Sequence, residues 1–239
     1  MKIALIGDIH ANLPALEAVL ADARAQAVEA VWNIGDFVGY GPHPEEVVQR
    51  CMREDMPAVI GNYDRKTLNY ADKGVKTKNP LKQMAFAWAS AQLSPSSRAY
   101  LRSLPEQLRL ETQGWQALLC HASPASLKEH LTPQTPDARL RELAELAAAA
   151  LIICGHSHQP FARQVDGAWF INTGSVGRPD DGDPRACYAL LELAPGRLAV
   201  EHRRLEYDVE RAVNEIRARG LPAEFGEMLR QGRALEQIR

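Results

Sequence analysis

Residues 2–10 read KIALIGDIH, a short apolar run followed at once by a glycine, an aspartate and a histidine. The same design returns much later, where residues 151–158 read LIICGHSH. An apolar run of this length, bounded by a glycine turn, is typical of a strand buried inside a sheet. Each run therefore brings side chains that bind metal ions to the end of a buried strand.

Three further segments join a small or turn-forming residue to aspartate, asparagine or histidine, and they are Gly35-Asp36, Gly61-Asn62-Tyr63-Asp64 and Cys120-His121. Taken singly, such an aspartate is also explained as a helix cap or a turn residue. In an extended segment, residues two apart point to the same face, which predicts that Asp8 and His10 aim at one point. The same holds for His156 and His158. We interpret all five segments together as a site for more than one metal ion.

The composition of the 239 residues is that of a globular protein, with 46% hydrophobic and 24% charged residues. We find no repeat and no linker, and we expect a single domain over residues 1–239. A net charge of -2 gives no basis for binding a nucleic-acid polymer through its phosphates. No stretch approaches the roughly 20 apolar residues that span a membrane. The four cysteines lack CxxC spacing, which predicts buried free thiols in a cytoplasmic protein.

The first sixty residues alternate apolar runs with helical patterns. We expect helices at 14–26 and 44–53 between strands at 2–6, 30–34 and 58–60. Strands connected in this way pair in parallel, and ligands of parallel sheets bind beyond the carboxyl ends of the strands. Asp8, Asp36 and Asn62 all occupy that place.

The rest of the chain divides into a helical flank, a set of short strands and a helical tail. Residues 80–104 are expected to form a helical flank or cap with a break near Ser94-Pro95. Strands are expected at 116–120, 151–154, 161–165, 168–171, 186–193 and 198–202, with a helix at 137–150. The amphipathic tail, residues 208–239, is interrupted at 220–222 and is expected to cover the sheet, with a contact surface for a partner as the alternative.

The ligand types and their number indicate the metal chemistry. Oxygen and imidazole donors without thiolates favour manganese, iron, zinc or magnesium. Ligands from five places exceed the four that a single tetrahedral zinc requires. Two ions about 3.5–4 Å apart, sharing one carboxylate, fit better and polarise a phosphoryl oxygen while acidifying a bridging water. Asp8, Asp36 and a hydroxide would leave the pair with about one positive charge for an anionic phosphate.

The ordered motifs resemble the calcineurin-like metallophosphoesterase superfamily, in particular its small bacterial branch of phosphodiesterases and diadenosine-tetraphosphatase-like proteins. The resemblance runs from about residue 1 to 220 and is carried by residues 7–10, 35–42, 61–64, 121–124, 155–158 and 172–177. It implies an α/β fold, a four-layer α/β/β/α sandwich with a two-metal site on one edge of the paired sheets.

The resemblance also implies a ligand set and a mechanism. One ion would be held by Asp8, His10, Asp36 and His158. The other would be held by Asp36, Asn62, His121 and His156. A hydroxide bridging the ions would attack phosphorus in line, and Asn62 would help to stabilise the equatorial oxygens. The implied cofactor is a pair of divalent ions, with Mn²⁺ ranked first and Fe, Zn, Mg and Ni as the other candidates.

One position departs from the superfamily. Its commonest fourth motif is Gly-Asn-His-Asp, whose histidine is thought to protonate the leaving oxygen, and here that position is Tyr63. A general acid contributes about 10²–10⁴-fold, and a tyrosine with an ordinary pKa of about 10 is a weaker donor. We therefore predict a preference for activated phosphodiesters and nucleotide phosphoanhydrides over alkyl monoesters.

Asn62, Tyr63, Asp64 and His43 make up the candidate catalytic set. For Asp64 we expect a role in orienting a ligand, with a plain turn residue as the alternative. His43 is a candidate substitute acid, with an exposed loop histidine as the alternative. For Arg65 and Arg178, contact with a substrate phosphate and exposure to solvent are equal alternatives. We expect His130 at the surface.

The leading hypothesis is a two-metal phosphoesterase whose partner is a small, nucleotide-type phosphoester. The alternative is a catalytically weak or silent protein that uses the fold as an interaction scaffold. Tyr63 gives that alternative its basis, whereas the complete ligand set argues against it. A zinc amide hydrolase is disfavoured because the chain lacks an HExxH segment.

Overall fold

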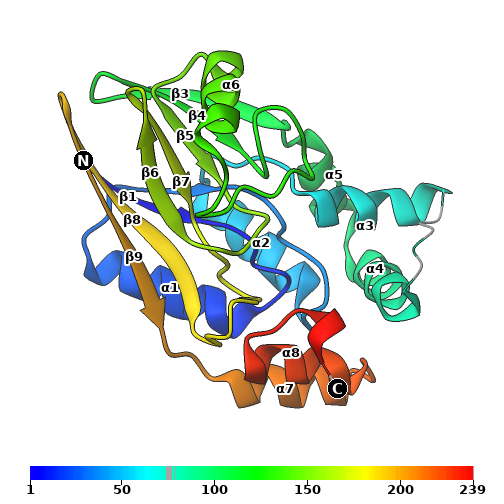
Figure 1. Ribbon diagram of the computed structural model, residues 1–239. Coiled ribbons are helices and arrows are strands. Elements are labelled where there is room, and N and C mark those ends of the chain that lie inside the picture. Colours follow the sequence, from blue (N-terminus) through cyan, green and yellow to red (C-terminus); the bar gives the residue numbers. More distant parts are fainter. Residues whose placement is uncertain (74–76, 78, 239) are drawn as a thin grey trace.

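The computed structural model describes residues 1–73, 77 and 79–238. Its strands are β1 (Lys2–Ile6), β2 (Ala30–Asn33), β3 (Gln107–Thr112), β4 (Trp115–Cys120), β5 (Leu151–Cys154), β6 (Phe161–Val165), β7 (Ala168–Asn172), β8 (Ala186–Ala194) and β9 (Arg197–Leu205). They form one sheet of order β2-β1-β8-β9 and a second of order β3-β4-β5-β7-β6 (Figure 1). Strands β1 and β2 are parallel, as are β4, β5 and β7, so several strand ends point to the same edge.

Helices connect and flank the strands. They are α1 (Leu13–Ala25), α2 (Pro44–Glu54), α3 (Asn62–Lys73), α4 (Pro80–Gln92), α5 (Pro95–Ser103), α6 (Asp137–Ala147), α7 (Val209–Ala218), α8 (Ala223–Gln231) and the short 3-10 helix η1 (Leu235–Gln237). Four of them, α1, α2, α4 and α5, have proline in the first two positions, where its fixed φ suits a helix and no amide is needed. Asn12, Asn79 and Ser94 cap three of these helices by accepting hydrogen bonds from first-turn amides.

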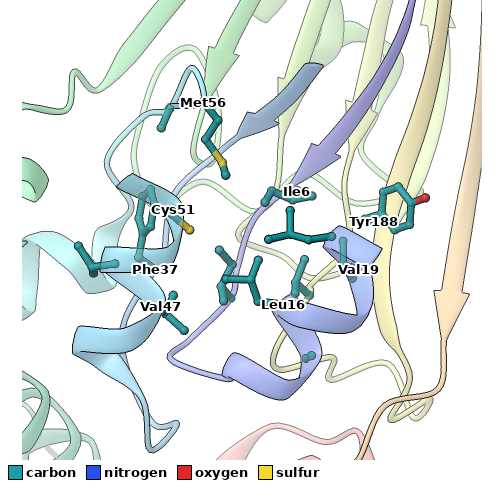
Figure 2. Close-up of a cluster of buried hydrophobic side chains, with 14 of the residues drawn as sticks. Ile6, Leu16, Val19, Phe37, Val47, Cys51, Met56 and Tyr188 are labelled. Carbon is teal, nitrogen blue, oxygen red and sulfur yellow. The ribbon is translucent and has the colours of Figure 1, made fainter. Parts of the chain in front are cut away.

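The hydrophobic side chains form three stacked layers, which explains the uninterrupted apolar runs. Leu5 of β1 and Ile153 of β5 belong to the core between the two sheets. Ile6 faces the other way and packs with Leu16 of α1 on the outer side of the first sheet (Figure 2). On the outer side of the second sheet, Leu140 of α6 belongs to a third cluster. The predicted helix, sheet, sheet, helix sandwich is confirmed.

The prediction of a third parallel strand is wrong. Residues 58–60 make a single parallel bridge, between Ala58 and Asn33, instead of a strand. The amide of Val59 donates to Asn33 (3.0 Å), but the amide of Ile60 donates to Pro105 (2.9 Å) in the segment before β3. The ladder stops because the chain turns from the first sheet toward the second at this point.

The tail forms two helices, α7 and α8, separated at the predicted break, but its expected position over the sheet is wrong. Ile216 of α7 and Phe225 of α8 pack in one cluster with Tyr40 and with Ala85 of α4. Figure 1 shows the tail in orange and red beyond the end of the sandwich. The tail covers the loops that follow the strands because its apolar side chains pack against aromatic side chains there, such as that of Tyr40.

Two expectations from composition can be compared with the fold. The four cysteines are free and buried, as predicted. Among the described helices, none combines the length and the apolar character needed to cross a membrane.

Leu16→Ala should lower the free energy of unfolding by about 2–5 kcal/mol, because it opens a cavity between α1 and the first sheet. Leu146→Ala on α6 is the matched control, since Leu146 is 58% exposed, and its effect should stay within about 0.5 kcal/mol. Urea denaturation measures both values. Equal losses in the two variants would contradict this account of the core.

Candidate metal centre

The predicted ligands lie where the chain leaves β1, β2, β4 and β5. His158 Nε2 is 3.2 Å from Asp8 Oδ1, and His10 Nε2 is 3.8 Å from the same oxygen. Asp36 Oδ2 lies 3.8 Å from His10 Nε2 and 3.6 Å from His121 Nε2. All five side chains are buried. The predicted convergence of Asp8, His10, Asp36, His121 and His158 is thus present in the structure.

The backbone reaches this arrangement by sharp turns, which corrects the geometry expected from the sequence. Asp8 and His10 do not belong to an extended segment, because both have a φ of 49°. Asp36, His156 and His158 also have positive φ, between 54° and 65°. Each such residue costs about 1–2 kcal/mol, and strain of this kind gathers at functional sites. The backbone amides of Asp8 and His10 donate hydrogen bonds to the carbonyl oxygens of Gly35 and Asp36 (2.9 Å each). These bonds hold the turns in place.

Two glycines make room for the carboxylates. A Cβ on Gly61 would lie 2.0 Å from Asp36 Oδ1, and one on Gly155 would lie 2.4 Å from Asp8 Oδ2. Both distances are far below van der Waals contact, so a side chain at either position would displace a carboxylate. The glycines in these motifs are therefore required by the site itself.

One group of possible ligands comprises Asp8, His10 and His158, whose donor atoms lie within 4.8 Å of one another. Asp8 Oδ2 accepts a hydrogen bond from the amide of His156 (2.9 Å). Asp8 Oδ1 is buried and lies 3.2 Å from His158 Nε2, but it forms no hydrogen bond with any described residue. A buried carboxylate oxygen without a partner is costly, whereas a divalent cation would satisfy it. These residues fit a metal ion.

A second group comprises Asp8, Asp36 and His121. Asp36 Oδ1 accepts from the amide of Tyr63 (2.7 Å), which leaves Oδ2 facing the imidazoles. His121 Nδ1 lies 2.9 Å from the carbonyl oxygen of Ile34, to which it can donate, so that Nε2 is free to bind a metal. Asn62 Oδ1 is 2.8 Å from this Nε2. Asn62 therefore lies beside the second group.

His156 lies beside these groups without joining either of them. Its ring centroid is 5.1 Å from that of His121 and 4.5 Å from that of His130. Burial and the nearby His121 lower the pKa of His156 to about 3, so the ring is neutral and offers a lone pair. His130 is exposed, as predicted, but its ring packs against that of His156.

Burial and the close packing of like charges shift the pKa values of the groups at this centre. Burial and the Asp8 charge raise the pKa of Asp36 well above its usual range. Burial, Arg178 and His158 hold the pKa of His10 well below its usual range. Burial and Arg178 also lower the pKa of His158. The charges of Asp8 and Asp180 outweigh them, so that the pKa of His158 is raised to about 9. A bound divalent ion would reverse this balance by favouring ionised carboxylates and neutral imidazoles.

The sequence motifs that supply these residues match those of a known protein family. The model of the calcineurin-like phosphoesterase superfamily domain matches residues 1–196. The chain is a calcineurin-like phosphoesterase. An uncharacterized protein of Methanocaldococcus jannaschii is 31% identical over 97% of this chain and 98% of its own length.

Two solved structures extend the similarity of this phosphoesterase to almost its whole length. A metallophosphoesterase from Sphaerobacter thermophilus has 32% identity and a TM-score of 0.82, over 97% of this chain and 99% of that one. A hypothetical protein from Pyrococcus horikoshii has a TM-score of 0.84 over 97% of this chain and 98% of that one, at 21% identity, and shows the shared fold. Both cover the tail helices as well as the two sheets.

Asp180 is a residue of the centre that the strand-end pattern missed. Its Oδ2 lies 3.3 Å from His158 Nδ1. A carboxylate behind a ligating imidazole fixes the ring orientation and raises its basicity. Asp180 follows Gly177-Arg178-Pro179 in the loop between β7 and β8. No apolar strand leads directly into it, so the pattern that found the other residues did not apply.

Of the two arginines weighed for substrate contact, only Arg178 lies at the centre. Its guanidinium is almost fully buried, 3.5 Å from His158 Nε2 and 5.1 Å from the Tyr40 ring centroid. Its Nε has no hydrogen-bond partner among the described residues. Arg65, in contrast, pairs with Glu106 and is partly exposed.

Asp64 positions the loops of the phosphoesterase motifs. Its Oδ2 accepts from the amides of Asp36 and Gly61 (2.9 Å each), and its Oδ1 accepts from that of Val38 (3.1 Å). Burial and the Asp36 charge raise the pKa of Asp64 to about 7. The carboxylate thereby ties the Gly35-Asp36 loop to the Gly61-Asn62 loop.

The two candidate acids have different surroundings. The Tyr63 hydroxyl is 2.8 Å from that of Tyr40, and its ring meets the His10 ring edge-on at 5.1 Å. Burial and Tyr40 raise the pKa of Tyr63 well above its usual range. The expectation of an exposed His43 is wrong: its side chain is 3% exposed, and Nε2 lies 2.7 Å from Glu215 Oε2. The α7 helix covers this loop.

Asp180→Asn should weaken metal binding by about 10–100-fold, because the carboxamide loses the charge that makes His158 a better donor. Asp183→Asn is the matched control in the same loop, since Asp183 pairs with Arg185 (2.7 Å). Titration with Mn²⁺ against a competing chelator measures both affinities. If the two variants bind metal equally well, Asp180 has no role in positioning His158.

Proposed function

We propose that this phosphoesterase is a two-metal hydrolase acting on small phosphodiesters or nucleotide phosphoanhydrides. The observation that carries the proposal is the position of Asp36 Oδ2, which faces His10 Nε2 at 3.8 Å and His121 Nε2 at 3.6 Å. Asp36 Oδ2 thus lies between an imidazole of the first group and one of the second, which suits a ligand that bridges two ions, and Asp8 belongs to both groups.

The ligand assignment is the one that the family resemblance implies; the two groups in the structure contain most of these residues but share Asp8 and leave out His156. Asp8, His10, Asp36 and His158 would hold one ion. Asp36, Asn62, His121 and His156 would hold the other. When bound, the ions would polarise a phosphoryl oxygen and supply a nucleophilic hydroxide, and the oxygen and imidazole donors support Mn²⁺ as the first choice.

The protein's own residues would bind and orient the phosphate. Asn62 can turn its amide donor toward an equatorial oxygen, and Arg178 brings a buried positive charge to the same region. Asp64 would keep Asp36 and Asn62 in register through the backbone bonds that it accepts. The substrate would therefore meet donors that are already in place before the reaction begins.

The environment of Tyr63 supports a substrate with a good leaving group. Its hydroxyl is engaged with Tyr40, and its raised pKa makes it hold its proton more tightly than an exposed tyrosine. His43 has its Nε2 engaged with Glu215 instead. A nitrophenolate or a nucleotide phosphate departs with little protonation, whereas an alkoxide needs an acid.

The buried free cysteines support a further part of the proposal, that the protein works in the reducing cytoplasm. The small, nucleotide-type partner and the absence of a membrane role belong to the same proposal.

The Mn²⁺-loaded protein should hydrolyse bis-nitrophenyl phosphate, and Asp36→Asn should reduce kcat at least about 100-fold by removing the shared carboxylate. Nitrophenolate release measures the rates, and metal analysis reports how many ions remain. Arg65→Ala is the control and should keep the full rate. No hydrolysis with any of Mn, Fe, Zn, Mg or Ni, in a protein that still binds metal, would favour the interaction scaffold.

Tyr63→His should raise the hydrolysis of an alkyl monoester such as glycerol phosphate at least about tenfold, because imidazole is the better proton donor at neutral pH. The rate with bis-nitrophenyl phosphate should stay within about threefold, since its leaving group needs little help. Tyr63→Phe controls for loss of the hydroxyl. A wild-type protein that cleaves glycerol phosphate as fast as the nitrophenyl diester would refute the proposed preference.

A further inference from the structure

Lys66 of α3 lies over a pair of aromatic rings. Its Nζ is 5.1 Å from the centroid of the Tyr63 ring and 5.5 Å from that of the Phe86 ring on α4. The two rings pack against each other, with their centroids 5.0 Å apart, where α3 and α4 lie side by side (Figure 1). Aromatic faces attract a cation, so the ammonium group has a defined position.

The position of Lys66 in α3 directs its side chain toward the metal centre. The helix begins at Asn62, and residues four apart on a helix lie on one face with about 5–6 Å between their Cβ atoms. Helical side chains also lean toward the N-terminus of their helix, which here is the turn that carries Asn62. Asn62 Oδ1 is 2.8 Å from His121 Nε2, so this turn lies at the second ligand group. Lys66 is therefore one helical turn from that group.

The contacts of Tyr63 place Lys66 at the same edge of the centre. The Tyr63 ring contacts Lys66 and also the ring of His10, whose centroid is 5.1 Å away. The Tyr63 amide donates to Asp36 Oδ1 (2.7 Å). Burial lowers the pKa of Lys66, and the charge of Asp36 opposes that effect, so the two groups interact through space. In the metal-loaded protein Asp36 would bind the ions, which would leave the ammonium group without this compensating charge.

Lys66 is a cation without an acceptor among the residues that the structure describes. Its side chain is partly buried and forms neither an ion pair nor a hydrogen bond with any of them. The neighbouring cations differ, since Arg65 pairs with Glu106. Lys82 of α4 pairs with Glu236. A partly buried ammonium group without an acceptor is unfavourable, and a cation–π contact returns only about 0.5–2 kcal/mol. An anion bound beside Lys66 would satisfy it.

A second lysine adds to the positive charge. Lys128 belongs to the loop that begins at His121 and connects β4 to α6. Its side chain is exposed and forms no ion pair within the described part of the chain. After burial and Asp36, the charge of Lys128 has the next largest effect on the pKa of Lys66, which it lowers. Unpaired like charges that lie near each other create a positive potential, which attracts anions.

We propose, on the basis of the two-metal hydrolase proposed above, that Lys66 binds the phosphate group next to the reacting one. The preferred substrate is then a phosphoanhydride, such as a nucleoside polyphosphate, and not a simple diester. Its reacting phosphate would lie at Asn62 and the ions, while the next phosphate would accept a hydrogen bond from the Lys66 ammonium group. Lys128 would add positive charge on the same side.

The same contact would assist the departure of the leaving group. A hydroxide oxygen forms the new bond to the reacting phosphorus, and the bridging P–O bond breaks with its electron pair left on the departing phosphate. The proton of the hydroxide passes to solvent as the product phosphate ionises. Lys66 would offset the negative charge that the departing phosphate gains in the transition state. Tyr63 then need not supply a proton.

Binding of two anions tests the site without hydrolysis. At a fixed concentration of free Mn²⁺, imidodiphosphate should bind the Mn²⁺-loaded wild type at least about tenfold more tightly than Lys66→Met, the usual effect of removing a charge-assisted hydrogen bond. Inorganic phosphate should bind both proteins with affinities within about twofold, because it has no second phosphate to reach Lys66. Calorimetric titration measures the affinities.

Two further variants control for charge and folding. Lys66→Arg should keep most of the affinity for imidodiphosphate, because a guanidinium group also donates to phosphate. Arg65→Met removes a positive charge from the same turn of α3, but Arg65 pairs with Glu106, so both anions should bind as they do in the wild type. Unchanged binding of inorganic phosphate shows that a variant retains its fold and its ions.

Hydrolysis tests the substrate preference. Lys66→Met should lower kcat/KM for ATP at least about tenfold and that for bis-nitrophenyl phosphate by no more than about twofold, since nitrophenolate departs with little help. A wild-type protein that cleaves the nitrophenyl diester but not ATP would overturn the preference.

Two binding results would overturn the role of Lys66 while leaving the hydrolase intact. Equal losses of affinity for imidodiphosphate and inorganic phosphate in Lys66→Met would show a general effect of charge. No loss for either anion would leave Lys66 as a cover for the two aromatic rings. Conversely, a selective loss for imidodiphosphate, in a protein that hydrolyses neither ATP nor the diester, would support the site and refute the hydrolase.

Discussion

The meeting of two carboxylates, Asp8 and Asp36, among buried imidazoles is the constraint on which the rest of the structure depends. Both carboxylates come from the first sheet, after β1 and β2, whereas His121 and His158 follow β4 and β5 of the second sheet. The centre therefore exists only when the two sheets pack face to face. The apolar core between the sheets, with Leu5 and Ile153, sets the spacing of the ligands as much as the loops do.

Gathering these groups is unfavourable without a cation, and the surrounding loops hold them against that cost. Three features keep these loops from relaxing. They are the positive φ angles at Asp8 and Asp36, the close approach of Gly61 and Gly155 to the carboxylates, and the backbone hydrogen bonds that Asp64 accepts. Strained and desolvated donors suit a divalent ion, because its charge would offset that of the buried carboxylates. Stability given up at this edge is recovered in the three apolar clusters behind it.

The tail gives the centre its surroundings. Packing of α7 and α8 against Tyr40 and α4 buries His43 and removes water from around Tyr63, which raises the pKa of Tyr63. A tail lying over the sheet, as its amphipathic pattern alone suggested, would have left the centre open on this side. The same contacts therefore shape the surroundings of Tyr63, the weak leaving-group acid.

The sequence by itself determined most of the strand ends and the metal-type residues, because apolar period and glycine turns are local signals, whereas the sandwich followed from the resemblance to the superfamily. It could not find Asp180, which follows no apolar strand, or foresee that residues 58–60 turn toward the second sheet. It also could not show that Asp8 and His10 converge through left-handed turns and not along a strand. Only the tertiary structure decided which side chains touch and what the tail covers, because these contacts join residues far apart in the chain and depend on packing that no local pattern records.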